Sequence, residues 1–139
     1  YEMQRSLVGS EMCIRDSDYP DAVRWVAAKE NVPLIELNGM TAILFNALGV
    51  DNSTKAFVHY PAGTFPGQTR TLKDNTHFST YGAYEVSKCV IEGMKKADLE
   101  IVKYLRPDYS GFDPAQPDSF ESFKWNLGSF TENEKPDGN

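Results

Sequence analysis

An aspartate and a histidine three positions apart are the residues of this chain best suited to acid–base chemistry. Asp74 and His77 lie in TLKDNTHFSTYGAYE, residues 71 to 85, just ahead of a helix-like run. Histidine transfers protons readily near neutral pH. A carboxylate that accepts the Nδ1 proton fixes the imidazole tautomer and stabilises the imidazolium. We predict that Asp74 and His77 lie in a loop whose single turn brings the carboxylate onto the ring.

Two other interpretations of this spacing stay open. Asp74 can be a turn residue and His77 a surface or capping side chain, because a motif as short as Asp-x-x-His often occurs by chance. A metal site is the second interpretation, with His59 as a third ligand. One carboxylate and two distant imidazoles form no recognised ligand spacing, so we predict no metal here.

The elements before the pair predict an α/β protein. DYPDAVRWVAAKEN, residues 18–31, is typical of a helix, with Asp18 as N-cap. VPLIEL, residues 32–37, suits a buried strand of a parallel sheet. A second helix is predicted by the apolar positions Met40, Ile43, Leu44, Ala47 and Leu48, with Gly49 ending it. Helix, strand and helix in this order make half of a βαβ arrangement.

The elements around and after the pair are less regular. Residues 51–76 are predicted to be mostly loop, with a short strand in KAFVHY, residues 55–60. A helix is expected from Tyr81, capped by Ser79 or Thr80. Its predicted apolar face, which would dock on a sheet, consists of Ala83, Val86, Val90, Met94 and Ala97. Residues 98–106 indicate a further helical segment, which Pro107 ends.

Residues 107–139 are rich in Pro, Asp, Ser and Gly and predict an extended tail. Its aromatic residues could pin it to the surface: Phe112, Phe120, Phe123, Trp125 and Phe130. The last nine residues have a composition typical of disorder.

Composition excludes some classes of function. The net charge is −6, and no basic stripe is present, which argues against a nucleic-acid partner. No apolar run approaches the roughly 18 residues of a membrane span. Cys13 and Cys89 form no metal-ligand spacing, and Cys89 is expected to be a small buried hydrophobe in a helix.

The first seventeen residues are set apart from fold reasoning. YEMQRSLVGSEMCIRDS has no sustained periodicity and resembles translated sequencing-adapter text. A natural disordered N-terminus is the alternative. If the segment is an artefact, the chain is a C-terminal fragment, and its start says nothing about a signal peptide.

Several segments resemble the SGNH/GDSL hydrolases. DNTHFSTYGAYEVSK is similar to the last motif block of that superfamily, in which Asp-x-x-His precedes the final helix of a flavodoxin-like sandwich. YPDAVRWVAAKENVPLIELN looks like the preceding helix and strand, and KAFVHYPAGTFPGQTRTLKDNTHF like the connecting loop of the rhamnogalacturonan acetylesterases, carbohydrate esterase family twelve. GFDPAQPDSFESF resembles the extension of bacterial members. The resemblance implies that residues 18–106 are the C-terminal part of a three-layer α/β/α sandwich, which is incomplete here.

The resemblance also implies a reaction. His77 would be the general base and Asp74 its orienting carboxylate, in a serine esterase that removes acetyl groups from rhamnogalacturonan-type pectic polysaccharide. Neither metal nor organic cofactor is needed for that chemistry. The partner implied is an acetylated polysaccharide, and the location implied is extracellular or periplasmic.

The family's nucleophile, in a Gly-Asp-Ser motif after the first strand, has no counterpart in this sequence. Ser17, in Arg-Asp-Ser, lacks the glycine and a preceding strand, and only 57 residues separate it from Asp74. We therefore expect the chain alone to be inactive, and its apolar sheet edge to be exposed with poor solubility.

Three functions remain open: a truncated acetylesterase, a lipase- or thioesterase-like member of the superfamily, and a non-catalytic α/β binding module. His59, Tyr60 and Phe65 could line a sugar-binding groove or simply anchor the loop to the protein, and the sequence does not decide between these roles.

Overall fold

A computed structural model describes residues 18–124 of the chain as a mixture of helices and one small sheet. The elements in chain order are α3 (Asp18–Lys29), α4 (Leu37–Lys55), β1 (Phe57–Tyr60), β2 (Leu72–Phe78), α5 (Thr80–Lys96) and the 3-10 helix η1 (Glu100–Tyr104). This confirms the α/β class in its coarse form. The predictions for residues 1–17, for Trp125 and Phe130 and for the last nine residues lie outside the described residues. None of the helices in residues 18–124 is both long and apolar enough to cross a membrane.

The strand predicted for residues 32–37 is wrong. Residues 32–36 form an irregular connection, and Leu37 already belongs to α4. The only sheet in residues 18–124 is the antiparallel pair β1–β2, so no described strand pairs with this apolar run. A run of apolar residues becomes a strand only where a neighbouring strand accepts its backbone hydrogen bonds.

Helix α4 is longer than predicted, and it is rotated relative to the predicted face. Gly49 takes a left-handed backbone angle (φ 73°) and kinks the helix, but the chain resumes helical geometry to Lys55, so the prediction that Gly49 ends it is wrong. Leu44 is fully buried, whereas Ile43 is 49% exposed. Two of the five residues of the expected apolar stripe, Ile43 and Ala47, are therefore exposed.

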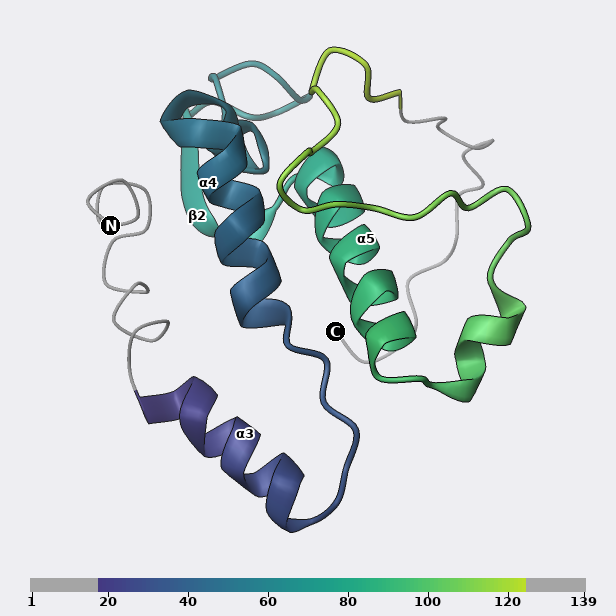
Figure 1. Cartoon of the computed structure of the whole chain (residues 1–139). Coiled ribbons are helices and arrows are strands. Elements are labelled where there is room, and N and C mark those ends of the chain that lie inside the picture. Colours follow the sequence, from purple (N-terminus) through teal and green to yellow (C-terminus); the bar gives the residue numbers. More distant parts are fainter. Residues whose placement is uncertain (1–17, 125–139) are drawn as a thin grey trace, which may run out of the picture.

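Helix α5 begins as predicted and packs differently. Ser79 is the N-cap, and its hydroxyl accepts a hydrogen bond from the Gly82 backbone N–H at 3.1 Å. The helix packs chiefly against α4 rather than on a sheet, and Ala83 of the predicted face is exposed. Figure 1 shows α4 and α5 side by side with the tail crossing α5.

The core lies between these two helices and the hairpin. Its buried apolar members are Leu44, Phe45, Ala56, Phe57, Tyr81, Val86 and Cys89. Cys89 is a buried helical hydrophobe, as predicted, and burial raises the pKa of its thiol to about 11. The helical segment predicted for residues 98–106 exists as the shorter η1.

The tail is pinned to the body by aromatic rings, as predicted for the residues that are described. Phe112 and Phe123 pack against the core, and the Phe120 ring meets the Tyr81 ring edge-on at 5.3 Å between centroids. The Tyr81 hydroxyl donates a hydrogen bond to the Asp118 carbonyl at 2.6 Å.

A buried ion cluster holds the tail as well. Lys88 Nζ lies 2.7 Å from Glu85 Oε1 and 2.8 Å from Asp118 Oδ2. Glu85 is fully buried, and burial raises the pKa of its carboxyl group. Without Lys88, that carboxylate would be an uncompensated charge inside the protein.

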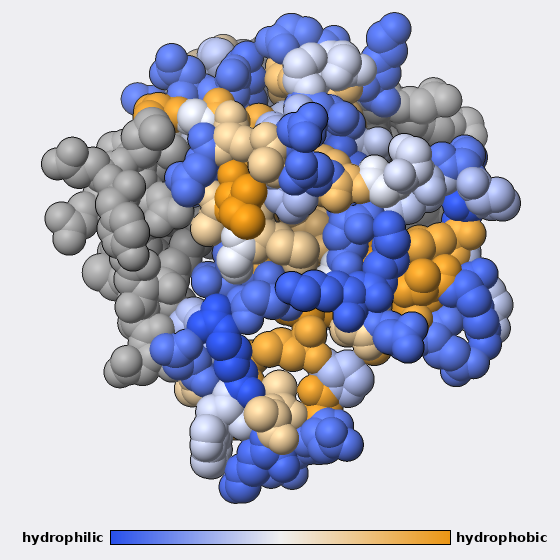
Figure 2. Space-filling view, in the orientation of Figure 1, coloured by the Kyte–Doolittle hydropathy of each residue, from blue (hydrophilic) through white to orange (hydrophobic). Residues whose placement is uncertain are grey.

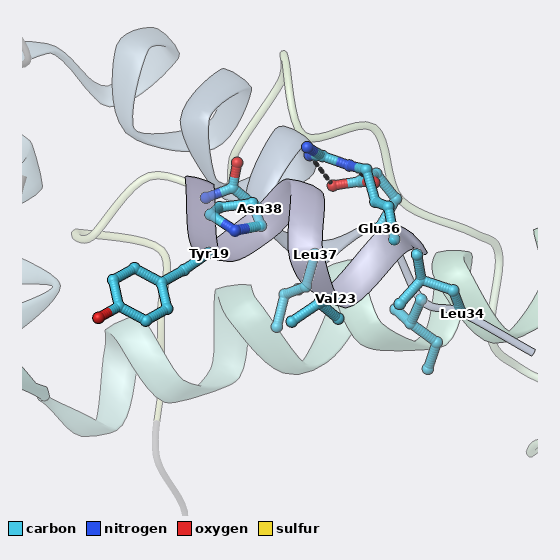
Figure 3. Close-up of a pocket in the computed structure, with 9 residues that line it drawn as sticks. Tyr19, Val23, Leu34, Glu36, Leu37 and Asn38 are labelled. Atoms are coloured by element: carbon cyan, nitrogen blue, oxygen red, sulfur yellow. Dashed lines mark hydrogen bonds and ion pairs between the residues drawn. The ribbon is translucent and has the colours of Figure 1, made fainter. Parts of the chain in front are cut away.

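Helix α3 leaves apolar surface uncovered. Val23 is 56% and Val26 49% exposed, and a pocket of about 320 Å³ separates this helix from residues 34–38. Figure 2 shows hydrophobic side chains around the hollow between α3 and the body. Arg24 spans the gap with two 2.7 Å hydrogen bonds to the Glu36 carboxylate. Figure 3 shows Glu36 together with the apolar side chains of Val23 and Leu37, which line the same pocket. The exposed apolar surface that we expected is therefore present, but on a helix rather than at a sheet edge.

Candidate active site

The Asp–His pair lies on an irregular strand of the β1–β2 hairpin. Val58 pairs with Asp74, but its neighbour Phe57 pairs with Phe78, so residues 75–77 form an insertion in the ladder. A bulge of this kind bends the strand and re-aims its side chains. The prediction that the pair lies in a loop is wrong, because β2 includes both residues. The predicted turn between Asp74 and His77 is formed by the bulge within this strand.

The structure brings the two side chains into direct contact. His77 Nδ1 lies 2.7 Å from Asp74 Oδ2. The other carboxylate oxygen, Oδ1, accepts hydrogen bonds from the backbone N–H groups of Thr76 (2.7 Å) and His77 (3.0 Å). All three contacts are local, so the bulge and the carboxylate hold each other in place.

These donors keep Asp74 ionised. The backbone N–H groups of His77 and Thr76, followed by the His77 ring, lower the pKa of the Asp74 carboxyl group to about 2. An ionised carboxylate only accepts hydrogen bonds, so Nδ1 carries the ring hydrogen in neutral His77. Nε2 then has the lone pair. A histidine in this tautomer can take a proton at Nε2 while the carboxylate stabilises the resulting imidazolium.

The pair is open to solvent. The side chain of His77 is 77% exposed and that of Asp74 37% exposed. A proton donor can reach Nε2 without any movement of the described chain.

His59, the third ligand of the metal interpretation, has another partner. Its Nε2 lies 2.6 Å from the Asn75 side-chain oxygen, across the hairpin. Among residues 18–124, no group of three or more His, Cys, Asp or Glu side chains could hold a metal ion. Arg70 and Lys73, which precede the pair, are exposed.

Sequence reasoning missed Asn75. It stands next to Asp74 in the bulge and ties the bulge to β1 through His59. Nothing in the local pattern indicates this, because the partner lies sixteen positions away and only the hairpin register brings it near.

The comparisons with known proteins show what the chain is similar to. It is similar to proteins named as rhamnogalacturonan acetylesterases, which confirms the resemblance seen in the sequence. No family model matches it, and no solved structure matches it.

Two relatives show this similarity. The chain is 38% identical over 88 residues to rhamnogalacturonan acetylesterase RhgT of Bacillus subtilis (strain 168), a match that covers 63% of this chain and 38% of RhgT. It is 30% identical over 92 residues to the probable rhamnogalacturonan acetylesterase YesY of the same organism, covering 64% of this chain and 38% of YesY. The chain thus spans less than two fifths of the length of these curated relatives.

Proposed function

We propose that this chain supplies the acid–base pair of a serine esterase that removes acetyl groups from rhamnogalacturonan-type pectic polysaccharide. The observation that carries the proposal is the 2.7 Å contact between His77 Nδ1 and an Asp74 carboxylate held ionised by backbone N–H groups. The names of the two relatives support the substrate class.

In the proposed mechanism, His77 Nε2 takes the proton of a serine hydroxyl as the serine oxygen attacks the acetyl carbonyl carbon. The tetrahedral intermediate collapses, and the imidazolium gives its proton to the departing sugar oxygen. Water, deprotonated by the same nitrogen, then attacks the acyl-enzyme and releases acetate. Asp74 stays ionised throughout and stabilises each imidazolium.

The serine and the oxyanion donors are proposed to come from the part of such an enzyme that this chain does not match. This sequence contains no Gly-Asp-Ser after a strand. We propose that residues 18–106 take their place in a three-layer α/β/α sandwich. The polysaccharide substrate favours an extracellular or periplasmic location.

A chimera with RhgT tests the proposal. The segment of RhgT that matches this chain is replaced by the corresponding residues here, and acetate release from acetylated rhamnogalacturonan is measured. We expect activity in the chimera, and a loss of about 10³-fold or more in kcat/KM for His77→Ala, because a triad acts as a unit. Asp74→Asn should lose about 10³-fold through the wrong tautomer.

Circular dichroism of each variant establishes that the chimera is folded. Ser87→Ala is the control, since Ser87 is exposed on α5 and its hydroxyl donates a hydrogen bond to the Ala83 carbonyl of the same helix, so the pair and its bulge stay intact. A folded, active chimera that keeps its activity in His77→Ala would refute the assignment. Faster hydrolysis of long acyl esters than of acetyl esters would favour a lipase-like enzyme instead.

A further inference from the structure

A second hollow lies beside the Asp–His pair and is built differently from the groove at α3. It has a volume of about 400 Å³ and lies between the end of β1, the first turn of α5 and the tail. Its lining includes Lys55, His59, Tyr60, Tyr81, Phe120 and Phe123. Concave sites with aromatic walls and few convergent polar groups are typical of small-molecule binding.

The aromatic wall is held in position. Tyr81 meets Phe120 and Phe123 edge-on, with centroids 5.3 and 5.6 Å apart. The Tyr81 hydroxyl and the Lys88 ammonium both bind Asp118, so the tail that carries the two phenylalanines is anchored to α5. Aromatic faces of this kind suit the C–H faces of a sugar ring.

The lining also presents a cation. Lys55 Nζ lies 5.2 Å from the centroid of the Phe120 ring and 3.1 Å from Glu121 Oε1. The Glu121 side chain is 72% exposed, and an exposed ion pair of this type contributes little to stability. Its carboxylate shows where an incoming carboxylate would bind, and it can be displaced at small cost.

The hollow is joined to the pair through the hairpin. His59 lines the hollow and hydrogen-bonds Asn75, the residue next to Asp74. Ser79 and Thr80, which follow β2 directly, line it too. The hollow therefore lies against the same hairpin that carries His77.

We propose that this hollow is a subsite for a uronate unit of the polysaccharide, in which Lys55 binds the sugar carboxylate and the aromatic rings contact the sugar face. This inference rests on the proposed function, because that function supplies the polysaccharide that would occupy the hollow. Binding itself does not require ester hydrolysis.

Titration calorimetry on the complete 139-residue chain tests the subsite. The probes are trigalacturonate and a neutral galactose trisaccharide. We expect the acidic trisaccharide to bind more tightly, with an affinity that falls as salt is added. Lys55→Met should weaken it about tenfold or more, the usual effect of losing a charged hydrogen-bond partner. Lys55→Arg should retain binding, and Glu121→Gln should strengthen it by removing the internal competitor.

Lys103→Met is the matched control. Lys103 also pairs with a glutamate, Glu100, and lies 5.2 Å over an aromatic ring, that of Tyr104, but it does not line the hollow. Equal affinity for the neutral and acidic sugars would overturn the proposal. So would unchanged binding in Lys55→Met, or an equal loss in Lys103→Met. If Lys55→Met unfolds, the tighter binding of trigalacturonate expected for Glu121→Gln still tests the subsite, and its absence would overturn the proposal.

The subsite and the esterase can fail separately. An inactive but folded RhgT chimera, together with Lys55-dependent binding of trigalacturonate, would refute the esterase and leave the subsite. An active chimera, together with no Lys55-dependent binding of trigalacturonate, would refute the subsite and leave the esterase.

Discussion

Gly82 lies directly against the carbonyl group of Ala56. A Cβ placed on Gly82 would be 1.9 Å from the Ala56 oxygen and 2.7 Å from its carbonyl carbon. The same oxygen accepts a hydrogen bond from the Ser79 N–H at 3.0 Å. The first turn of α5 therefore packs closely against Ala56, the residue that joins α4 to β1. Because β2 leads directly into α5, this contact fixes the position of the end of β2.

Gly82→Ala should therefore destabilise the protein by about 3 kcal/mol, at the upper end of overpacking costs, because the clash is with backbone. Gly39→Ala, in the first turn of α4, is the control. Its Cβ would have only the Glu36 Cγ within 4 Å, at an ordinary 3.8 Å, and the substitution gains helix propensity. Chemical denaturation measures both, and equal losses would contradict the argument.

The Asp74 carboxyl group should titrate near pH 2, as followed by the chemical shift of its side-chain carbon. Its folded pKa lies below the ordinary 3.8, so the stability it contributes is present above that value and is lost as pH falls toward 2. In His77→Ala the pKa should remain low, because the two leading causes are backbone N–H groups. A return to the ordinary value in that variant would show that the ring dominates.

Lys88→Met should destabilise the protein by about 3–5 kcal/mol, because it leaves the buried Glu85 unpaired. The loss should shrink as pH falls, since the raised pKa of Glu85 lets it become a neutral buried acid. Urea denaturation at two pH values measures this. Lys103→Met, an exposed pair, should change stability by less than about 0.5 kcal/mol. Adding Glu85→Leu to Lys88→Met should recover most of the loss.

The 139-residue chain by itself should not hydrolyse p-nitrophenyl acetate in a His77-dependent way, because it lacks the motif that carries the serine. Initial rates for the chain and for His77→Ala, compared with the rate in buffer, test this. A clear difference between the two proteins would mean that the chain carries a nucleophile of its own.

Short-range features of this protein could be predicted from the sequence. The Asp74–His77 contact, the Ser79 cap and helix α5 all depend on residues within a few positions of one another, where backbone geometry leaves few arrangements. The resemblance of several segments to one family could also be recognised from the sequence, because it depends on the order and spacing of residues along the chain.

Only the tertiary structure decided the features that join distant parts of the chain. Residues 32–37 are not a strand because no described strand pairs with them, and Ile43 faces solvent because α4 turns Leu44 toward α5. The bulge around residues 75–77 and the His59–Asn75 contact follow from the hairpin register. The wall of the hollow depends on the tail, thirty or more residues beyond α5's first turn. Apolar pattern and spacing determine which local structures are possible, but a contact between distant residues depends on which surfaces are present to be buried.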